Sequence, residues 1–367
     1  MDRKHRIVLG LGIYMAASLF AGCGRSEEVS TDAAGTKTQE QEMKEGGQED
    51  LPEAPIEIDT SRPVEKGARI AVVTKSTEGE FWNSIKNGME DAVKYLNQAY
   101  GLKGEEKITM TFEGPDDAKE LTDMINTVDA VLSENPSVLC LAAGDEDAGQ
   151  AQLETARDNG IPVILFDSML AVDEDLYTAY CGTNDRKLGE EAAEKLAASM
   201  GGKGKVALIS HWKNDMTSIE RVEGFKDYLA REAPDMKLAG ELTMEEDEDL
   251  EQKIQNLLKK TPDLAGLFCT NIDVAETALD ALDAIEVEGL KVVGVDGSSR
   301  QIKAIEEGRE VGVVSQNPYL MGFQTIYTAS LAAADEKEVT DKRIYTDYAW
   351  LDAKNLEDPS NQPYFYK

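Results

Sequence analysis

The sequence predicts an α/β protein with two doubly wound parallel sheets covered by helices. From about residue 67 onward, short apolar runs alternate with helical patterns, as in chains of strand-helix units. Runs such as VILF at 163–166 lack the polar alternation of a half-exposed strand, so we expect them to be buried on both faces. So many units over a chain of 367 residues favour two sheets and two lobes over one.

Each element follows from its local pattern. The segment at 80–99 carries apolar residues at helical spacing, among them Ile85 and Met89. Further helices are expected at 118–133, 148–160, 218–232, 249–261, 274–285, 300–308 and 321–334. Strands are expected at 68–74, 107–114, 137–144, 161–167, 205–210, 237–243, 264–271, 291–297 and 311–317.

Composition excludes several classes of function. The apolar content of 41% is enough for a large core, and the net charge is −33. Nucleic acid is a poor partner for such a chain, because binding to phosphates needs a concentrated positive surface. The sequence has only two histidines, His5 and His211, so we expect no histidine-built metal site and no cofactor.

The N-terminus predicts export. A basic opening, MDRKHR, precedes an apolar stretch at 7–20, which is shorter than the about 20 residues of a spanning helix. FAGC at 20–23 resembles the lipobox of bacterial lipoproteins, although Phe20 departs from the usual Leu. The resemblance implies a signal peptide at 1–22 and a lipidated Cys23 as the mature N-terminus. The alternatives are a signal peptide that is removed outright, with Cys23 incidental, and a transmembrane anchor.

Residues 23–66 are predicted to form a disordered acidic linker between this anchor and the folded domain. The segment is rich in Glu, Gln, Ser, Thr and Gly, so it buries too little apolar surface to offset the entropy of ordering. The other cysteines, Cys140, Cys181 and Cys269, lie in apolar runs. They read as buried free thiols, although an exported protein can also form one disulfide.

Polar residues end the buried strands. Asp167, Asn271, Asp296 and Gln316 each follow an apolar run. In parallel α/β sheets, ligands bind beyond the carboxyl ends of the strands. These four side chains therefore predict one polar crevice built from several loops. Asp167 and Asp296 can also be helix caps or turn residues, and that interpretation stays open.

Several motifs in order resemble the ribose-type periplasmic sugar-binding proteins, relatives of the lactose-repressor effector domain. They are EFWNSIKNGMEDA, NGIPVILFDS, SIERVEGF, LFCTNIDVAETAL, VVGVDGS and VVSQNP. The resemblance implies the periplasmic binding protein type I fold, with two lobes joined by a three-segment hinge that closes on ligand. Its N-terminal lobe is expected at 67–182 plus 317–343, and its C-terminal lobe at 183–316 plus 344–367.

The same resemblance implies the ligand-binding residues Phe81, Trp82, Asp167, Arg221, Asn271, Asp296 and Gln316. Arg221 has a second interpretation as a surface ion-pairing residue. Of Phe81 and Trp82, we expect one in the core and one facing the ligand, without knowing which. Trp212 and Asn214 are candidates for the rim of the pocket in the second lobe, but we prefer to interpret them as ordinary loop residues.

Departures from the pattern make ribose itself doubtful. Ser168 stands where ribose binders carry Arg, and Gly79 where they carry Asn. An aromatic of the second lobe would fall in the acidic segment MEEDED at 244–249. Lys75 and the segment FDS also resemble receptors for a furanosyl autoinducer. Lys75 and Ser168 are therefore further candidates for ligand binding.

The resemblance predicts a monomeric, lipid-anchored protein on the outer face of the bacterial cytoplasmic membrane. It would bind a sugar or polyol, which the sequence does not name, and deliver it to an ABC-type permease. The alternative is a sensor lipoprotein that feeds a membrane sensor kinase. A hydrolase using Asp167 and Asp296 is the weaker reading, since the resemblance implies no enzyme, and a repressor would need a DNA-binding headpiece.

Overall fold

The computed structural model describes residues 54–116, 121–145, 149–245, 248–285 and 287–366. All of these residues belong to one compact unit, Asp50–Lys367. The predicted signal peptide at 1–22, Cys23 and the first part of the predicted linker lie outside the described residues. Within the described ranges, we find no helix with the length and apolarity needed to cross a bilayer.

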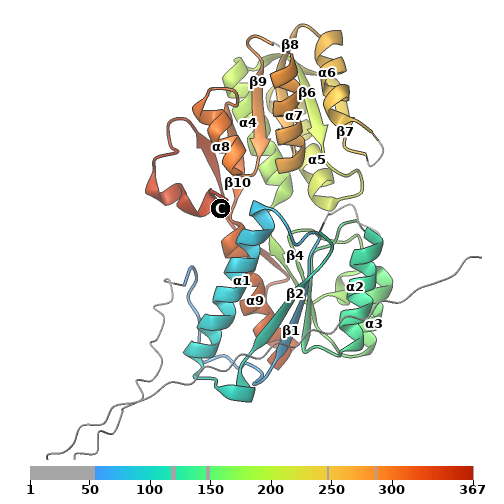
Figure 1. The fold of residues 1–367 in the computed structure, drawn as a ribbon, viewed down its shortest axis with the longest axis vertical. Coiled ribbons are helices and arrows are strands. Elements are labelled where there is room, and N and C mark those ends of the chain that lie inside the picture. The colour runs from blue at the N-terminus through green and yellow to red at the C-terminus, as the bar shows by residue number, and fades with distance from the viewer. Residues whose placement is uncertain (1–53, 117–120, 146–148, 246–247, 286, 367) are drawn as a thin grey trace, which may run out of the picture. The chain divides into compact units, whose positions relative to one another are not determined.

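Two six-stranded sheets, one in each lobe, confirm the predicted α/β fold. The sheet of the first lobe is parallel, in the order β11-β5-β4-β3-β1-β2. Its strands are β1 (Arg69–Val73), β2 (Thr109–Glu113), β3 (Val138–Leu141), β4 (Val163–Phe166), β5 (Ala179–Gly182) and β11 (Arg343–Tyr345). Figure 1 shows helices on both sides of this sheet, namely α1 (Glu80–Ala99), α9 (Pro318–Ala334), α2 (Leu121–Ser133) and α3 (Gln150–Asp158).

The second sheet has the order β12-β10-β9-β8-β6-β7. It contains β6 (Lys203–Ser210), β7 (Asp235–Thr243), β8 (Leu264–Cys269), β9 (Lys291–Val295), β10 (Gly312–Gln316) and β12 (Tyr348–Asp352). Only β12, at the edge, runs antiparallel to its neighbour within this sheet. Its helices are α4 (Asp185–Met200), α5 (Met216–Glu232), α6 (Leu250–Lys260), α7 (Ile272–Ala284) and α8 (Ser299–Glu306).

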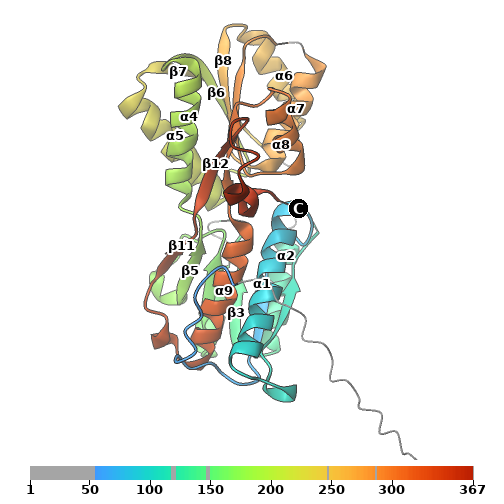
Figure 2. The same cartoon turned by 90° about the vertical axis from the view of Figure 1, so that its left-hand side faces the viewer.

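Three segments connect the two sheets. The chain leaves the first sheet after β5, returns to the first lobe after β10, and crosses again between β11 and β12. The last crossing is visible in Figure 2. Strand β11 keeps the chain in the first sheet as far as Tyr345, rather than to the expected boundary at residue 343.

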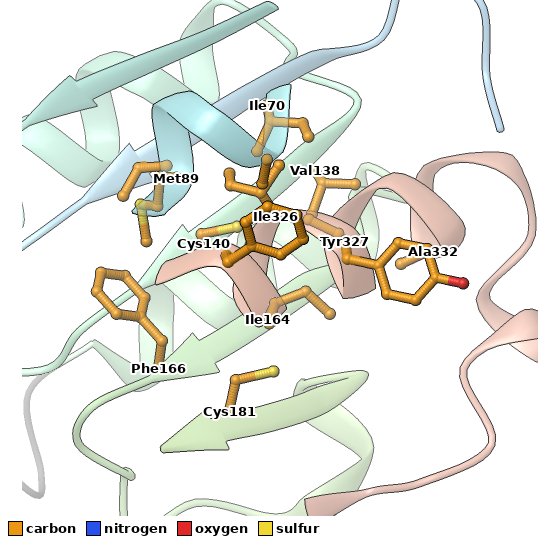
Figure 3. Packing of buried hydrophobic residues seen from close by; sticks show 14 of the residues in the cluster. Ile70, Met89, Val138, Cys140, Ile164, Phe166, Cys181, Ile326, Tyr327 and Ala332 are labelled. Atoms are coloured by element: carbon orange, nitrogen blue, oxygen red, sulfur yellow. The ribbon is translucent and has the colours of Figure 1, made fainter. Parts of the chain in front are cut away.

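Burial on both faces explains the unbroken apolar strands. Successive strand residues point to opposite faces of a sheet. In β1, Ile70 and Val72 belong to one core cluster, whereas Ala71 and Val73 belong to another. Figure 3 shows the first of these clusters, where side chains of α9 such as Ile326 pack over the strands. The strand positions are therefore fixed by apolar contacts on two sides.

Glycines allow two helix pairs to pack closely. A Cβ atom at Gly88 of α1 would lie 2.0 Å from the Tyr319 carbonyl oxygen of α9, and one at Gly322 would lie 2.1 Å from that of Ile85. In the second lobe, a Cβ at Gly189 of α4 would lie 2.1 Å from the carbonyl oxygen of Arg221 in α5. These contacts leave no room for any larger residue, and the last one fixes the backbone of a predicted site residue.

The folded lobe begins before the expected boundary at residue 67. Ile56, Ile58 and Val64 are partly buried against the core of the first lobe. The backbone N–H of Asp59 donates to the hydroxyl of Tyr327 (3.3 Å). The prediction of a disordered linker up to residue 66 is therefore wrong for 54–66. This stretch has few apolar residues, but Ile56, Ile58 and Val64 all pack against the core of the first lobe.

Four elements were missed by the sequence analysis, namely β5, α4, β11 and β12. The strands β5 and β11 are only four and three residues long, which gives little periodic signal. The buried face of α4 is rich in alanine, so its apolar pattern is weak. The three described cysteines are buried free thiols, as predicted, and burial raises the pKa of Cys181 to about 12.

Candidate functional site

A pocket of about 640 Å³ lies at the carboxyl ends of the strands, with lining residues from both lobes. The structure brings together there every residue that the resemblance assigned to ligand binding. They are Phe81, Trp82, Asp167, Arg221, Asn271, Asp296 and Gln316, and Lys75 lines the pocket with them. Ser168 is the one candidate among the described residues that does not line it.

Asp167 and Asp296 share an unusual backbone conformation. Each directly follows a buried strand, and their φ angles are 58° and 81°. Asp tolerates this left-handed region better than most residues, yet the conformation remains strained and is typical of functional sites. Neither residue caps a helix, because Ser298 is the N-cap of α8 and no helix follows Asp167 directly. Their side chains are instead turned into the pocket from the strand ends.

Lys75 forms a buried ion triad across the two lobes. Its Nζ lies 2.9 Å from Asp167 Oδ2 in the first lobe and 2.7 Å from Asp215 Oδ2 in the second. Burial lowers the pKa of Lys75, but the two carboxylates outweigh burial and raise it above its usual value. Burial also raises the pKa of Asp215, but Lys75 and His211 together more than reverse that effect and hold the pKa well below its usual value. Lys75 and Asp215 are therefore both charged throughout the neutral pH range.

Arg221 is a buried pocket residue, not a surface ion-pairing residue. Only 2% of it is exposed. Its Nε donates to Asp185 Oδ1 (2.7 Å), and its Nη1 donates to the carbonyl of Thr270 (2.8 Å). Burial raises the pKa of Asp185 to about 7, although the guanidinium opposes this rise. These bonds hold the guanidinium plane in place and leave Nη2 without a hydrogen bond to the described residues.

Asp296 sits in a network of neutral donors. Its Oδ1 accepts from Gln316 Nε2 (2.8 Å) and from the hydroxyl of Tyr366 (3.1 Å), and its Oδ2 accepts from the N–H of Ile272 (3.2 Å). The other end of Gln316 accepts from Thr183 Oγ1 (2.7 Å). Sequence reasoning missed Tyr366, since nothing in a C-terminal YFY places its side chain behind the pocket.

Phe81 and Trp82, at the start of α1, both line the pocket and both pack against the core of the first lobe, so the expected division into one core residue and one ligand-facing residue is not seen. Phe81 and Trp82 are partly buried and their rings meet edge to face, with centroids 5.2 Å apart. Trp212, in the loop between β6 and α5 of the second lobe, also lines the pocket, as in the alternative interpretation of this residue. The pocket therefore has aromatic surface in both lobes, which suits the C–H faces of a sugar ring.

Ser168, Asn271 and Asn214 each form a hydrogen bond to another residue of the protein. Ser168 is 1% exposed, and its hydroxyl donates to Asp167 Oδ2 (3.2 Å). Asn271 lines the pocket and also caps α7, where its Oδ1 accepts from the N–H of Val274 (3.2 Å). Asn214 lies outside the pocket lining and donates to Asp145 Oδ2 across the lobes (3.2 Å).

A second buried network, also missed from the sequence, supports the ion triad. His211 Nδ1 lies 2.7 Å from Thr270 Oγ1, and its Nε2 lies 2.9 Å from Thr217 Oγ1. Thr217 in turn donates to Asp215 Oδ1 (2.7 Å). Because that bond uses the Thr217 proton, Nε2 of His211 is the donor to Thr217. The segment SHWKND at 210–215 was the available signal, since it follows a strand and is rich in polar side chains.

Further contacts join the lobes around the pocket. Glu80 Oε2 accepts from the N–H of Ser299 (2.8 Å), the first residue of α8, where the helix dipole favours a carboxylate. The rings of Phe81 and Tyr366 meet with centroids 5.6 Å apart. Among the described residues, no cluster of His, Cys, Asp and Glu is arranged to hold a metal ion.

Comparison with known proteins identifies similar chains. The family described as "Periplasmic binding protein domain" matches residues 70–337. The ribose import binding protein RbsB of Escherichia coli is 25% identical over 73% of this chain and 86% of its own length. The Bacillus subtilis protein of the same name is 26% identical over 69% and 77% of the two chains.

Solved structures show the same fold. An ABC transporter solute-binding protein from Agrobacterium vitis with bound D-fucose has a TM-score of 0.71 and 26% identity, over 82% of this chain and all of the other. A carbohydrate transporter solute-binding protein from Agrobacterium radiobacter, in complex with D-arabinose, has a TM-score of 0.72 and 20% identity, over 81% and 98% of the two chains. The names of these four proteins describe binding in import or transport.

Proposed function

This chain belongs to the periplasmic binding protein domain family, in its ribose-type, sugar-binding branch, and we propose that it captures a sugar or polyol for an ABC-type membrane transporter. One observation carries the proposal. Carboxylates, a guanidinium, amides and aromatic rings from the two lobes converge on one pocket. Such a mixture of directional polar groups and apolar faces is what a polyhydroxylated ring requires.

Each group has a role in this proposal. Asp167 and Asp296 accept hydrogen bonds from ligand hydroxyls, and Arg221 donates through its Nη2. Bonds to charged groups in a closed cleft are about twice as strong as bonds between neutral groups. Trp82 and Trp212 cover the C–H faces of the ring. Because Asp167 lies in one lobe and Arg221 and Asp296 in the other, a bound sugar stabilises the closed arrangement of the lobes.

The binding proposal is tested by a thermal-shift screen of the full chain with monosaccharides, polyols and furanosyl signals. A ligand at 100 times its dissociation constant adds about 2.7 kcal/mol to the free energy of unfolding. Asp167→Ala and Asp296→Ala should each abolish most of the shift, whereas Glu306→Gln, on the exposed surface of α8, should keep it. A full shift in both alanine variants would place the binding site elsewhere.

Anchoring at the outer face of the cytoplasmic membrane is a second part of the proposal. It is supported by the basic and apolar opening of the sequence and by the FAGC segment that ends at Cys23. Mass spectrometry of the mature protein should find a lipid on Cys23, and Cys23→Ser should release the protein from the membrane. An unmodified Cys23 in a membrane-bound protein would contradict this part alone.

The alternative role is a sensor that passes ligand occupancy to a membrane kinase. Lys75 in the pocket favours it, because a similar lysine is found in receptors for a furanosyl autoinducer. The two roles share the site and differ in the partner. Ligand-dependent uptake that is lost on deletion of the chain supports transport, whereas normal uptake with a lost transcriptional response supports sensing.

A further inference from the structure

The buried part of the pocket contains more negative than positive charge. Five Asp, Lys and Arg side chains of its lining are each at most 7% exposed: Asp167, Asp215, Asp296, Lys75 and Arg221. Three carboxylates of the lining thus face two cations. An uncompensated buried charge costs free energy. A site with excess negative charge therefore favours a ligand that carries a positive charge.

The two cations are already engaged. Lys75 pairs with Asp167 and Asp215, and Arg221 pairs with Asp185. Asp296 forms no ion pair with any residue in the described ranges and accepts only from neutral groups. Of the three carboxylates of the lining, Asp296 is therefore the one that has no cation in ion-pair contact, although Arg221 attracts it from a greater distance.

The rim of the pocket does not supply the missing charge. The other ionisable residues of the lining, His211 apart, are all acidic: Glu78, Glu80, Asp116, Asp273 and Glu276. Apart from Lys75 and Arg221, the lining contributed by the described residues includes no Lys or Arg. A ligand with a phosphate or carboxylate would thus meet repulsion on entry, whereas a cation would be attracted.

A free acceptor faces the pocket as well. Asp167 is 5% exposed and lines the pocket, and its Oδ2 is used by Lys75 and Ser168. Its Oδ1 accepts no hydrogen bond from the residues that the structure describes. Trp82 and Trp212, which also line the pocket, offer ring faces that attract cations as well as C–H groups.

We propose that the ligand is a sugar or polyol that carries a protonated amino group, with its ammonium against Asp296 and its hydroxyls on Asp167 and Arg221. The proposal rests on the sugar-binding function above and narrows its ligand class. It predicts the order amino sugar, neutral sugar, acidic sugar, from tightest to weakest binding.

The test uses matched sugars that differ at one position. For glucose, galactose and mannose, the parent, the 2-amino-2-deoxy form and its N-acetyl form are titrated into the full chain by calorimetry. A pH of about 6.5 keeps the amine protonated. For at least one of the three sugars, the amino form should bind ten-fold or more tightly than both neutral forms.

Variants assign the preference to the carboxylates. Asp296→Asn keeps the shape of the side chain and removes its charge, so it should reduce the preference for the amino form about ten-fold. Asp167→Asn is a second variant if the first folds poorly, and Glu306→Gln is the control for loss of a distant charge.

The outcomes separate this inference from the function it rests on. Equal or tighter binding of neutral sugars overturns the amino preference and leaves sugar binding intact. If both asparagine variants keep the full preference for the amino form, Asp296 and Asp167 are not the residues that bind the ammonium group. If none of the nine compounds binds, the inference is overturned for hexosamines. The wider thermal-shift screen then tests the proposed sugar-binding function separately.

Discussion

Glu310, in the turn between α8 and β10, should make the stability of the second lobe depend on pH. It is 3% exposed, and both of its carboxylate oxygens lack a hydrogen-bond partner among the described residues. Burial raises the pKa of Glu310 to about 8, although Gln301 and Arg309 oppose part of the rise. The folded protein therefore keeps this carboxyl protonated at pH values where the unfolded chain ionises it.

The sign and size of the effect follow from this difference. Between about pH 4.5 and pH 8, the folded state binds one proton that the unfolded state has lost, so the free energy of unfolding falls as the pH rises. Each pH unit in this window costs about 1.4 kcal/mol. The whole window corresponds to about 3–5 kcal/mol, a large share of the stability of an ordinary domain.

The perturbation is Glu310→Gln, which has nearly the same shape and does not titrate. Urea denaturation of both proteins from pH 5 to pH 9 gives the free energy of unfolding at each pH. The glutamine variant should gain stability relative to the natural chain by about 3–5 kcal/mol over this range, with little further change above pH 8.

A control removes an equivalent charge from the surface. Glu306 is exposed on the neighbouring helix, so Glu306→Gln should leave the pH profile parallel to that of the natural chain. Parallel profiles for Glu310→Gln as well would refute the reasoning, because they would mean that the buried carboxyl is ionised in the folded protein or exposed by local opening.

Three other substitutions test the packing and the lobe contacts. Lys75→Met leaves Asp167 and Asp215 buried without their cation, so it should lower the free energy of unfolding by about 3–5 kcal/mol and increase the radius of gyration of the unliganded protein in X-ray scattering. Tyr366→Phe removes one donor to Asp296 and should weaken ligand binding several-fold with a stability loss of about 1 kcal/mol in calorimetry, whereas an unchanged affinity would show that Asp296 needs no such support. Gly322→Ala would place a Cβ 2.1 Å from a backbone oxygen of α1, so its melting temperature should drop by several degrees, and a variant as stable as the natural chain would mean that the two helices separate easily.

The sequence could predict several pocket residues for a simple geometric reason. Parallel strands bring their carboxyl ends to one edge of a sheet, so polar residues at the ends of β8, β9 and β10, namely Asn271, Asp296 and Gln316, must lie near one another. Asp167 follows β4 of the other sheet, and only the packing of the two lobes brings it to the same pocket. Arg221 was assigned by resemblance alone, because a residue inside a helix carries no such positional signal. Its place in the lining depends on α5 of the second lobe.

The sequence by itself determined the class of fold, since strand burial on two faces and helical spacing are local patterns that every residue helps to define. It also determined which strands end in a hydrogen-bonding side chain. Only the tertiary structure decided what those side chains contact. Lys75 reaches Asp215 across the lobes, Tyr366 supports Asp296 from the far end of the chain, and Ser168 donates to its neighbour Asp167 without lining the pocket. Such pairings join residues that are distant in sequence, or depend on the direction of one side chain, and no local pattern encodes either.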